Sequence, residues 1–165
     1  MDLVTTGLRW LHMLAAIALG GGLIYQRVAL VPIAGELTDA AKDRARRGWA
    51  IVVMVSVLFL LVSGLTNLIL TIKAYKAFTP GLEGSYHMLF GIKFLLALAL
   101  FFLASILAGR SDNAKKFQAN AKRWLNVSLL LLVIIVCISG VLRNLRENVL
   151  IENIEPAAIT DTTTG

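Results

Sequence analysis

Four long apolar stretches, separated by short polar segments, dominate the pattern of this sequence. They cover residues of about 8–31, 49–72, 86–108 and 124–142. Each stretch is close to the roughly 20 residues with which an α-helix crosses a bilayer. Lipid offers no partner for backbone N–H and C=O groups, so a spanning stretch of this kind must be helical. The pattern therefore predicts an all-α integral membrane protein, with a four-helix domain over residues 1–145 and a polar, disordered tail over residues 146–165.

The overall composition agrees with this prediction. Hydrophobic residues make up 58% of the 165 residues, and the mean hydropathy is +0.77. These values exceed those of ordinary soluble domains. The first stretch follows Asp2 and a single Arg9 and has no small-residue cleavage site after it. It is therefore a poor secretory signal, and we expect it to be a retained span.

Lysine and arginine are divided unevenly between the two ends of the predicted spans. Ten of these residues lie in or next to the first and third polar linkers, at about 32–48 and 109–123: Arg27, Lys42, Arg44, Arg46, Arg47, Arg110, Lys115, Lys116, Lys122 and Arg123. Five lie at the other end: Arg9, Lys73, Lys76, Arg143 and Arg146. The positive-inside rule then puts those two linkers in the cytoplasm and both termini on the outer side of an inner (plasma) membrane. The net charge of +6 reflects topology and attraction to anionic membrane lipid rather than nucleic-acid binding.

Uncommon residues recur at a spacing close to 75 along the chain. His12 and His87, each followed by Met-Leu, are 75 residues apart, as are Trp49 and Trp124. The Ser-Gly pairs at 63–64 and 139–140 are 76 apart. We infer a tandem repeat of a two-helix hairpin. Because a hairpin returns the chain to the same side, the two copies would be parallel about an axis along the membrane normal.

The repeat gives the two histidines a chemical meaning. His12 and His87 would lie at the same depth near the outer face, on the first and third helices, which are diagonal in an up-down-up-down bundle. That geometry suits a flat macrocycle with axial ligands from both sides, and so predicts a b-type haem. Gly64 and Gly140 would let the flanking backbones approach the ring. Arg143 lies at the end where propionates would emerge.

Other interpretations of the same residues stay open. Met13 and Met88 next to the histidines would suit Cu(I), so copper is the alternative cofactor. A histidine in the first turn of a span also lies commonly at the headgroup level without binding anything. The Ser-Gly pairs are typical of helix packing in membranes.

Lys93 is an ionisable residue inside the third apolar stretch. It follows His87 by six residues, or about 9 Å of helix rise. A charge at such a depth indicates a functional residue, here a candidate catalytic residue. It could neutralise a propionate, bind an acidic substrate or donate a proton. The alternative is an amine that extends along its own helix toward the headgroups.

Three consecutive glycines at 20–22 predict a close helix contact. We expect that contact with the third or fourth span or with a partner subunit. A structural subunit of a larger membrane complex, or a homo-oligomer, is accordingly a further hypothesis for the chain.

Several segments carry a family resemblance. "LHMLAAIALGGGLIYQR" (11–27), "IKFLL" (92–96) and "RWLNV" (123–127) resemble spans of HemJ-type protoporphyrinogen oxidases. "RRGWAIVVMVSVLFLLVSGL" (46–65) and "YHMLFGIKFLLALALFFLASILAGR" (86–110) are similar to the four-helix domain of the copper-resistance protein D (CopD) family. The first resemblance implies a haem-b membrane enzyme that oxidises protoporphyrinogen IX, in which His12 matches a histidine of the first span and Lys93 matches a lysine of the third. The second implies copper uptake.

Together these observations predict an integral membrane redox protein. Electron transfer, or a porphyrinogen- or quinol-linked oxidation, would require a redox partner or quinone.

Overall fold

The computed structural model describes the backbone of residues 3–78 and 83–161 and the side chains of residues 3–4, 6–70, 88–111 and 113–144. All regular structure in this part of the chain is helical. The elements are α1 (Leu3–Tyr25), the π-helix η1 (Gln26–Leu30), α2 (Val31–Ile33), α3 (Asp39–Phe78), α4 (Glu83–Ala108), α5 (Asp112–Ala119) and α6 (Ala121–Asp161). Four segments are long and apolar enough to cross a membrane: Thr6–Ile33, Asp39–Leu70, Met88–Ala108 and Ala121–Asn144. The prediction of an all-α chain with four such helices is confirmed.

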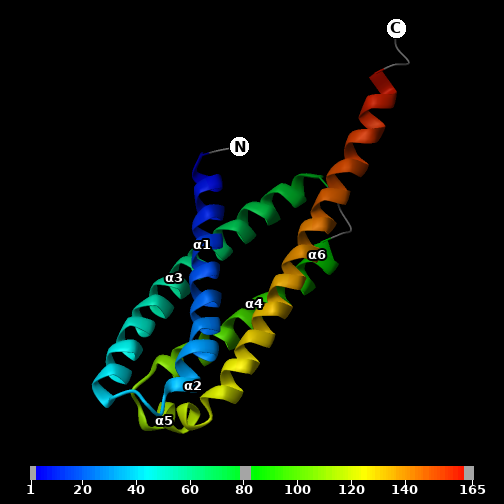
Figure 1. Ribbon diagram of the computed structural model, residues 1–165. Helices are drawn as coiled ribbons and strands as arrows, with labels where there is room; N and C mark the ends of the chain where they lie inside the picture. Colours follow the sequence, from blue (N-terminus) through cyan, green and yellow to red (C-terminus); the bar gives the residue numbers. More distant parts are fainter. Residues whose placement is uncertain (1–2, 79–82, 162–165) are drawn as a thin grey trace.

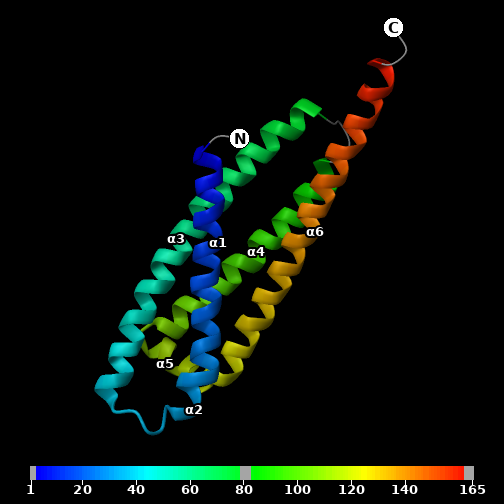
Figure 2. The same ribbon diagram turned by 45° about the horizontal axis from the view of Figure 1, so that its top comes forward.

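The four long helices form an antiparallel bundle in which α1 and α4 are diagonal. Helix α1 packs against α3 and, over a shorter length, against α6, while α4 packs between α3 and α6. Figures 1 and 2 show α2 and α5 at one end of the bundle and the start of α1 at the other, together with the last part of α6. We call these the α2/α5 end and the terminal end.

Helices α3 and α6 are longer than the apolar stretches that predicted them. Helix α3 begins at Asp39, ten residues before the stretch at 49–72, and α6 continues to Asp161. The segment 146–165, for which we predicted a disordered tail, therefore has a helical backbone as far as Asp161. Residues 145–155 favour a helix locally, because they contain neither glycine nor proline and include several Leu and Glu residues. The helix then continues through Pro156, which local propensity does not explain.

A widened turn ends the first span. Within η1 the Val31 N–H bonds to the Gln26 carbonyl, five residues back rather than four. Pro32 explains the change, because it has no N–H to give to the carbonyl four residues before it and its ring crowds that carbonyl. The extra residue in the turn absorbs the conflict without breaking the helix.

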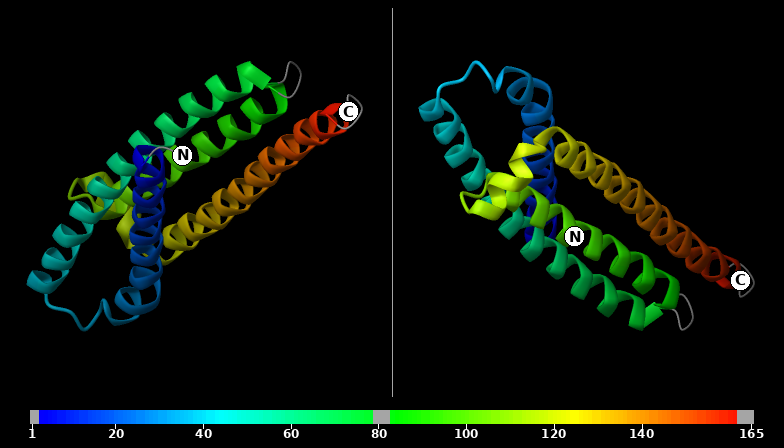
Figure 3. Two further views of the ribbon diagram at one scale, coloured as in Figure 1. Left: turned by 90° about the horizontal axis from the view of Figure 1, so that it is seen from above. Right: turned by 90° about the horizontal axis from the view of Figure 1, so that it is seen from below.

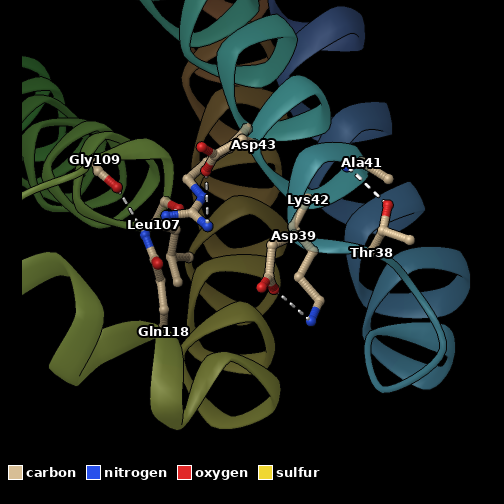
Figure 4. Close-up of polar contacts among 9 residues, drawn as sticks. Thr38, Asp39, Ala41, Lys42, Asp43, Leu107, Gly109 and Gln118 are labelled. Atoms are coloured by element: carbon tan, nitrogen blue, oxygen red, sulfur yellow. Dashed lines mark hydrogen bonds and ion pairs between the residues drawn. The ribbon is translucent and has the colours of Figure 1, made fainter.

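Side chains cap several helix termini at the α2/α5 end (Figure 4). Thr38 Oγ1 accepts the Ala41 N–H at 3.3 Å at the start of α3, and Ser111 Oγ accepts the Ala114 N–H at 3.2 Å at the start of α5. Gln118 Nε2 donates to the carbonyls of Leu107 and Gly109 at 3.1 and 2.8 Å, at the end of α4. These contacts satisfy backbone groups that helix ends leave unpaired.

The tightly packed core occupies the half of the bundle next to the α2/α5 end. It contains residues from all four long helices: Leu19, Leu23, Trp49, Val53, Leu100, Phe101, Ala104, Leu107, Ala108 and Leu125. Toward the terminal end the helices separate, and α1 and α6 diverge in both Figure 1 and Figure 2. The core therefore holds the helices together at one end, and the sequence-predicted site lies in the other half.

Two of the three consecutive glycines make close helix contacts, and one of these contacts is with a span that we predicted. A Cβ on Gly20 would lie 2.9 Å from Leu132 Cδ2, so α1 and α6 touch there, and contact with the fourth span is confirmed. A Cβ on Gly22 would lie 2.0 Å from Trp49 Cζ3, so the second close contact is with the second span. Gly21 meets no described atom within 4 Å.

Candidate functional site

His12 is held against α3 by a hydrogen bond to Ser63. The two residues are 51 positions apart, and the distance from His12 Nδ1 to Ser63 Oγ is 2.7 Å. His12 is half-buried on α1, whereas Ser63 is almost completely buried on α3. A Cβ placed on Gly64 would lie 3.7 Å from His12 Cε1. The Nδ1–Cε1 edge of the imidazole therefore faces the backbone of α3 at Ser63 and Gly64.

The proton on the Ser63 hydroxyl determines which nitrogen of His12 is free. That hydroxyl donates to the Phe59 carbonyl one helical turn earlier, with a longer contact of 3.4 Å to the Leu60 carbonyl. With its single proton used there, Ser63 Oγ acts as the acceptor for His12 Nδ1–H. The neutral ring then carries its lone pair on Nε2, which has no hydrogen-bond partner among the described residues. An imidazole whose Nδ1 donates to a second group is the usual form of a histidine metal ligand.

Lys93 lies on the helix diagonal to that of His12. Its side chain is half-buried on α4, and α4, like α1, packs against both α3 and α6. The contacts of the described residues therefore bring together His12 and Gly64 of the predicted site, along with Ser63.

The second hairpin matches the first in part. Ser139 Oγ donates to the Ile135 carbonyl at 2.6 Å, as Ser63 does to Phe59. Gly140 is exposed, and a Cβ there would meet no described atom within 4 Å. Arg143 is exposed on α6. His87 belongs to the helical backbone of α4, but its side chain lies outside the described residues.

The methionines next to the histidines lie largely on the outside of the bundle. Met13 is 54% exposed and Met88 is 64% exposed. Among the described side chains, no three of the histidine, cysteine, aspartate and glutamate residues come together as a metal-binding group. These positions give the copper hypothesis no geometric support beyond His12 itself.

Sequence reasoning missed a polar contact at the opposite end of the bundle. Arg27 Nε donates to Asn126 Oδ1 at 2.6 Å and so links η1 to α6. The available signal was Asn126 itself, a polar residue just inside the fourth apolar stretch. Two buried donors of the same half, Gln26 Nε2 and Trp49 Nε1, have no hydrogen-bond partner among the described residues.

The site described at the terminal end therefore consists of one oriented imidazole with a free Nε2, a neighbouring glycine and a half-buried ammonium group. Such a set can bind a metal centre through nitrogen and can neutralise an anionic group nearby. No protein-family model, curated protein or solved structure matches this chain.

Proposed function

We propose that this chain is an integral membrane redox protein that binds b-type haem near the terminal end of its helix bundle. His12 and His87 would hold the haem iron through their imidazole nitrogens. The site serves electron transfer or a porphyrinogen- or quinol-linked oxidation, in exchange with a redox partner or quinone. The proposal includes an inner-membrane location with both termini on the outer side, as the distribution of positive charge indicates.

The hydrogen bond between His12 and Ser63 carries this proposal. It fixes the ring against α3 and leaves Nε2 as the nitrogen with a free lone pair. Gly64 has no side chain to crowd the ring edge, and the surrounding half of the bundle lies outside the tightly packed core. An oriented neutral imidazole in an apolar setting is a donor that haem iron accepts. The residues present therefore fit the group.

The second ligand follows from the proposed tandem repeat. His87 stands 75 residues after His12, on the helix diagonal to α1. Two features support the repeat: α1 pairs with α3 as α4 pairs with α6, and Ser63 and Ser139 each donate to the carbonyl four residues earlier. In the repeated arrangement Ser139 would orient His87 as Ser63 orients His12.

The remaining polar residues of the proposed site would bind anionic groups or orient His12. When bound, haem supplies reversible one-electron chemistry that no side chain here offers. Lys93 would neutralise a carboxylate of the bound group, since an unpaired charge at this depth would be costly. Arg143, on the part of α6 near the terminal end of the bundle, would bind a second carboxylate. Ser63 keeps the proton of His12 on Nδ1.

The test is the reduced-minus-oxidised absorption spectrum of the detergent-purified full chain, expressed with ample haem. We expect sharp low-spin b-type bands that are lost in His12→Ala and in His87→Ala. Ser63→Ala should retain haem but bind it about 10–100-fold more weakly, as removal of an orienting partner usually does. Ser128→Ala is the matched control, because this buried serine donates to the Trp124 carbonyl at 2.9 Å, away from both histidines.

Two results would contradict the proposal. One is the absence of haem bands from correctly folded protein. The other is a spectrum that His12→Ala leaves unchanged. Copper analysis of the same preparation then decides whether the copper alternative replaces haem, and a preparation that holds neither cofactor favours a structural subunit.

A further inference from the structure

A cavity of about 640 Å³ lies at the α2/α5 end, far along the bundle from His12. Its walls come from the end of the first span, at Val31 and Ala34, and from the turn between α5 and α6, from Gln118 to Val127. The first span ends at Ile33 and the fourth begins at Ala121. The cavity therefore lies where both helices leave the apolar layer, at the depth of lipid headgroups.

The cavity has a positive and hydrogen-bonding lining. Lys122 and Arg123 contribute cations, Asn120 and Asn126 contribute amides, and none of the described lining residues is acidic. Arg27 adds a third cation at the margin, because its Nε donates to the lining Asn126 at 2.6 Å. That bond uses only one of the five N–H groups of the guanidinium.

These cations form no ion pair with any acidic side chain that the structure describes. Among the described side chains, the ion pairs join Lys42 to Asp39 and Arg46 to Asp43, both within α3. No described carboxylate neutralises Arg27, Lys122 or Arg123. The first turn of α6 also starts at this cavity, and the unpaired N–H groups of a helix start favour an anion.

We propose that this cavity binds the phosphate of an anionic phospholipid through Arg27, Arg123 and Asn126. Basic pockets between helices at a membrane surface typically bind anionic headgroups. The apolar walls, including Val31 and Val127, continue toward the bilayer and can contact the first part of the acyl chains. The bound lipid bridges η1 and α6 and strengthens the contact that Arg27 and Asn126 already make.

Native mass spectrometry of the full chain in detergent tests the proposal, with phosphatidylglycerol, phosphatidylcholine and inorganic phosphate as separate probes. We expect wild-type protein to retain phosphatidylglycerol in preference to phosphatidylcholine. The double variant Arg27→Gln/Arg123→Gln should bind it at least about tenfold more weakly, since charged hydrogen bonds are lost. The matched control Arg44→Gln/Arg47→Gln removes two exposed charges from α3 near the same end and should bind lipid as wild type does.

Asn126→Asp gives an independent test that does not depend on losing a helix contact. The new carboxylate keeps the acceptor for Arg27 and so preserves the link between η1 and α6, but it puts a negative charge into the lining. Lipid binding should fall as it does in the double arginine variant, while circular dichroism shows unchanged helix content.

Three outcomes would overturn the proposal. Equal losses in the two double variants would mean that lipid responds only to diffuse positive charge. Unchanged binding in Asn126→Asp would place the lipid elsewhere. Displacement of the lipid by millimolar inorganic phosphate, with equal thermal stabilisation by both, would show that the cavity binds free phosphate instead. None of these outcomes depends on haem binding.

Discussion

Adding one methyl group at Gly22 should separate α1 from α3. The new Cβ of Gly22→Ala would lie 2.0 Å from Cζ3 and 2.8 Å from Cη2 of Trp49. Ordinary carbon contacts are about 3.5–4.0 Å. The two helices must therefore move apart by more than 1 Å, or the Trp49 ring must leave its place in the core.

The cost of this change follows from the rigidity of the surroundings. Trp49 is only 9% exposed and belongs to the core cluster with Leu23 and Val53, so its ring has little space to move. Overpacking of such a site costs about 1–3 kcal/mol. Replacement of glycine by alanine also favours the helix by up to about 1 kcal/mol. Gly21→Ala shares that gain without the clash, because no described atom lies within 4 Å.

The free energy of unfolding can be measured by titrating the protein in mild detergent with sodium dodecyl sulfate and following helix content by circular dichroism. We expect Gly22→Ala to be about 1–3 kcal/mol less stable than Gly21→Ala. In a Trp49→Leu background the penalty of Gly22→Ala should largely disappear, because the ring that causes the clash is gone. The difference between the two backgrounds gives the coupling energy of the pair.

Equal stability of Gly22→Ala and Gly21→Ala would refute the close contact between α1 and α3. An undiminished penalty in the Trp49→Leu background would show that the methyl group meets something other than the Trp49 ring.

Three further predictions concern charge, capping and topology. If Lys93 lies beside the haem, Lys93→Gln should lower the midpoint potential of the haem by tens of millivolts, because a nearby cation favours the reduced state. Potentiometric titration measures this shift, with Arg110→Gln as the control. An unchanged potential would mean that Lys93 is not part of the site. Gln118→Ala should lower the free energy of unfolding by about 1 kcal/mol, since the Leu107 and Gly109 carbonyls lose their donor. Thermal unfolding of this variant beside the control Asn113→Ala tests the prediction. Equal stability of the two variants would mean that water replaces the amide. In a Cys137→Ser background, Asn113→Cys should react with an impermeant maleimide only in inside-out vesicles. Leu3→Cys should react only in right-side-out vesicles. The reverse pattern would contradict the proposed orientation, with both termini on the outer side.

The sequence predicted the four helices that are long and apolar enough to cross a membrane, because lipid leaves an apolar chain no other way to satisfy its backbone. It also anticipated that Ser63 and Gly64 would approach the layer of His12, since equal depth follows from hairpin topology. Hydropathy could not show where α3 begins and α6 ends, because both helices extend beyond the apolar stretches. Residues 39–48 and 145–155 continue α3 and α6 through more polar sequence, where intrinsic helix propensity favours the helix.

Contacts between helices were harder to predict than the helices themselves. An apolar face looks the same whether it meets lipid or protein, so nothing in the pattern showed that the core would gather around Trp49 and Leu23. The sequence marked Gly20 and Gly22 as residues of close helix contacts, but it did not show that their partners are Leu132 and Trp49. The short helix α5 was missed within a linker, although Ser111 followed by Asp112 is a typical helix start.

The confinement of tight packing to one end of the bundle has a mechanical consequence. Helices in a bilayer adjust their tilt when the apolar layer is thicker or thinner than their apolar length. With the helices clamped around Trp49, a change of tilt moves their free ends the most. In a bilayer, the separation of α1 and α4 near His12 should therefore change with membrane thickness.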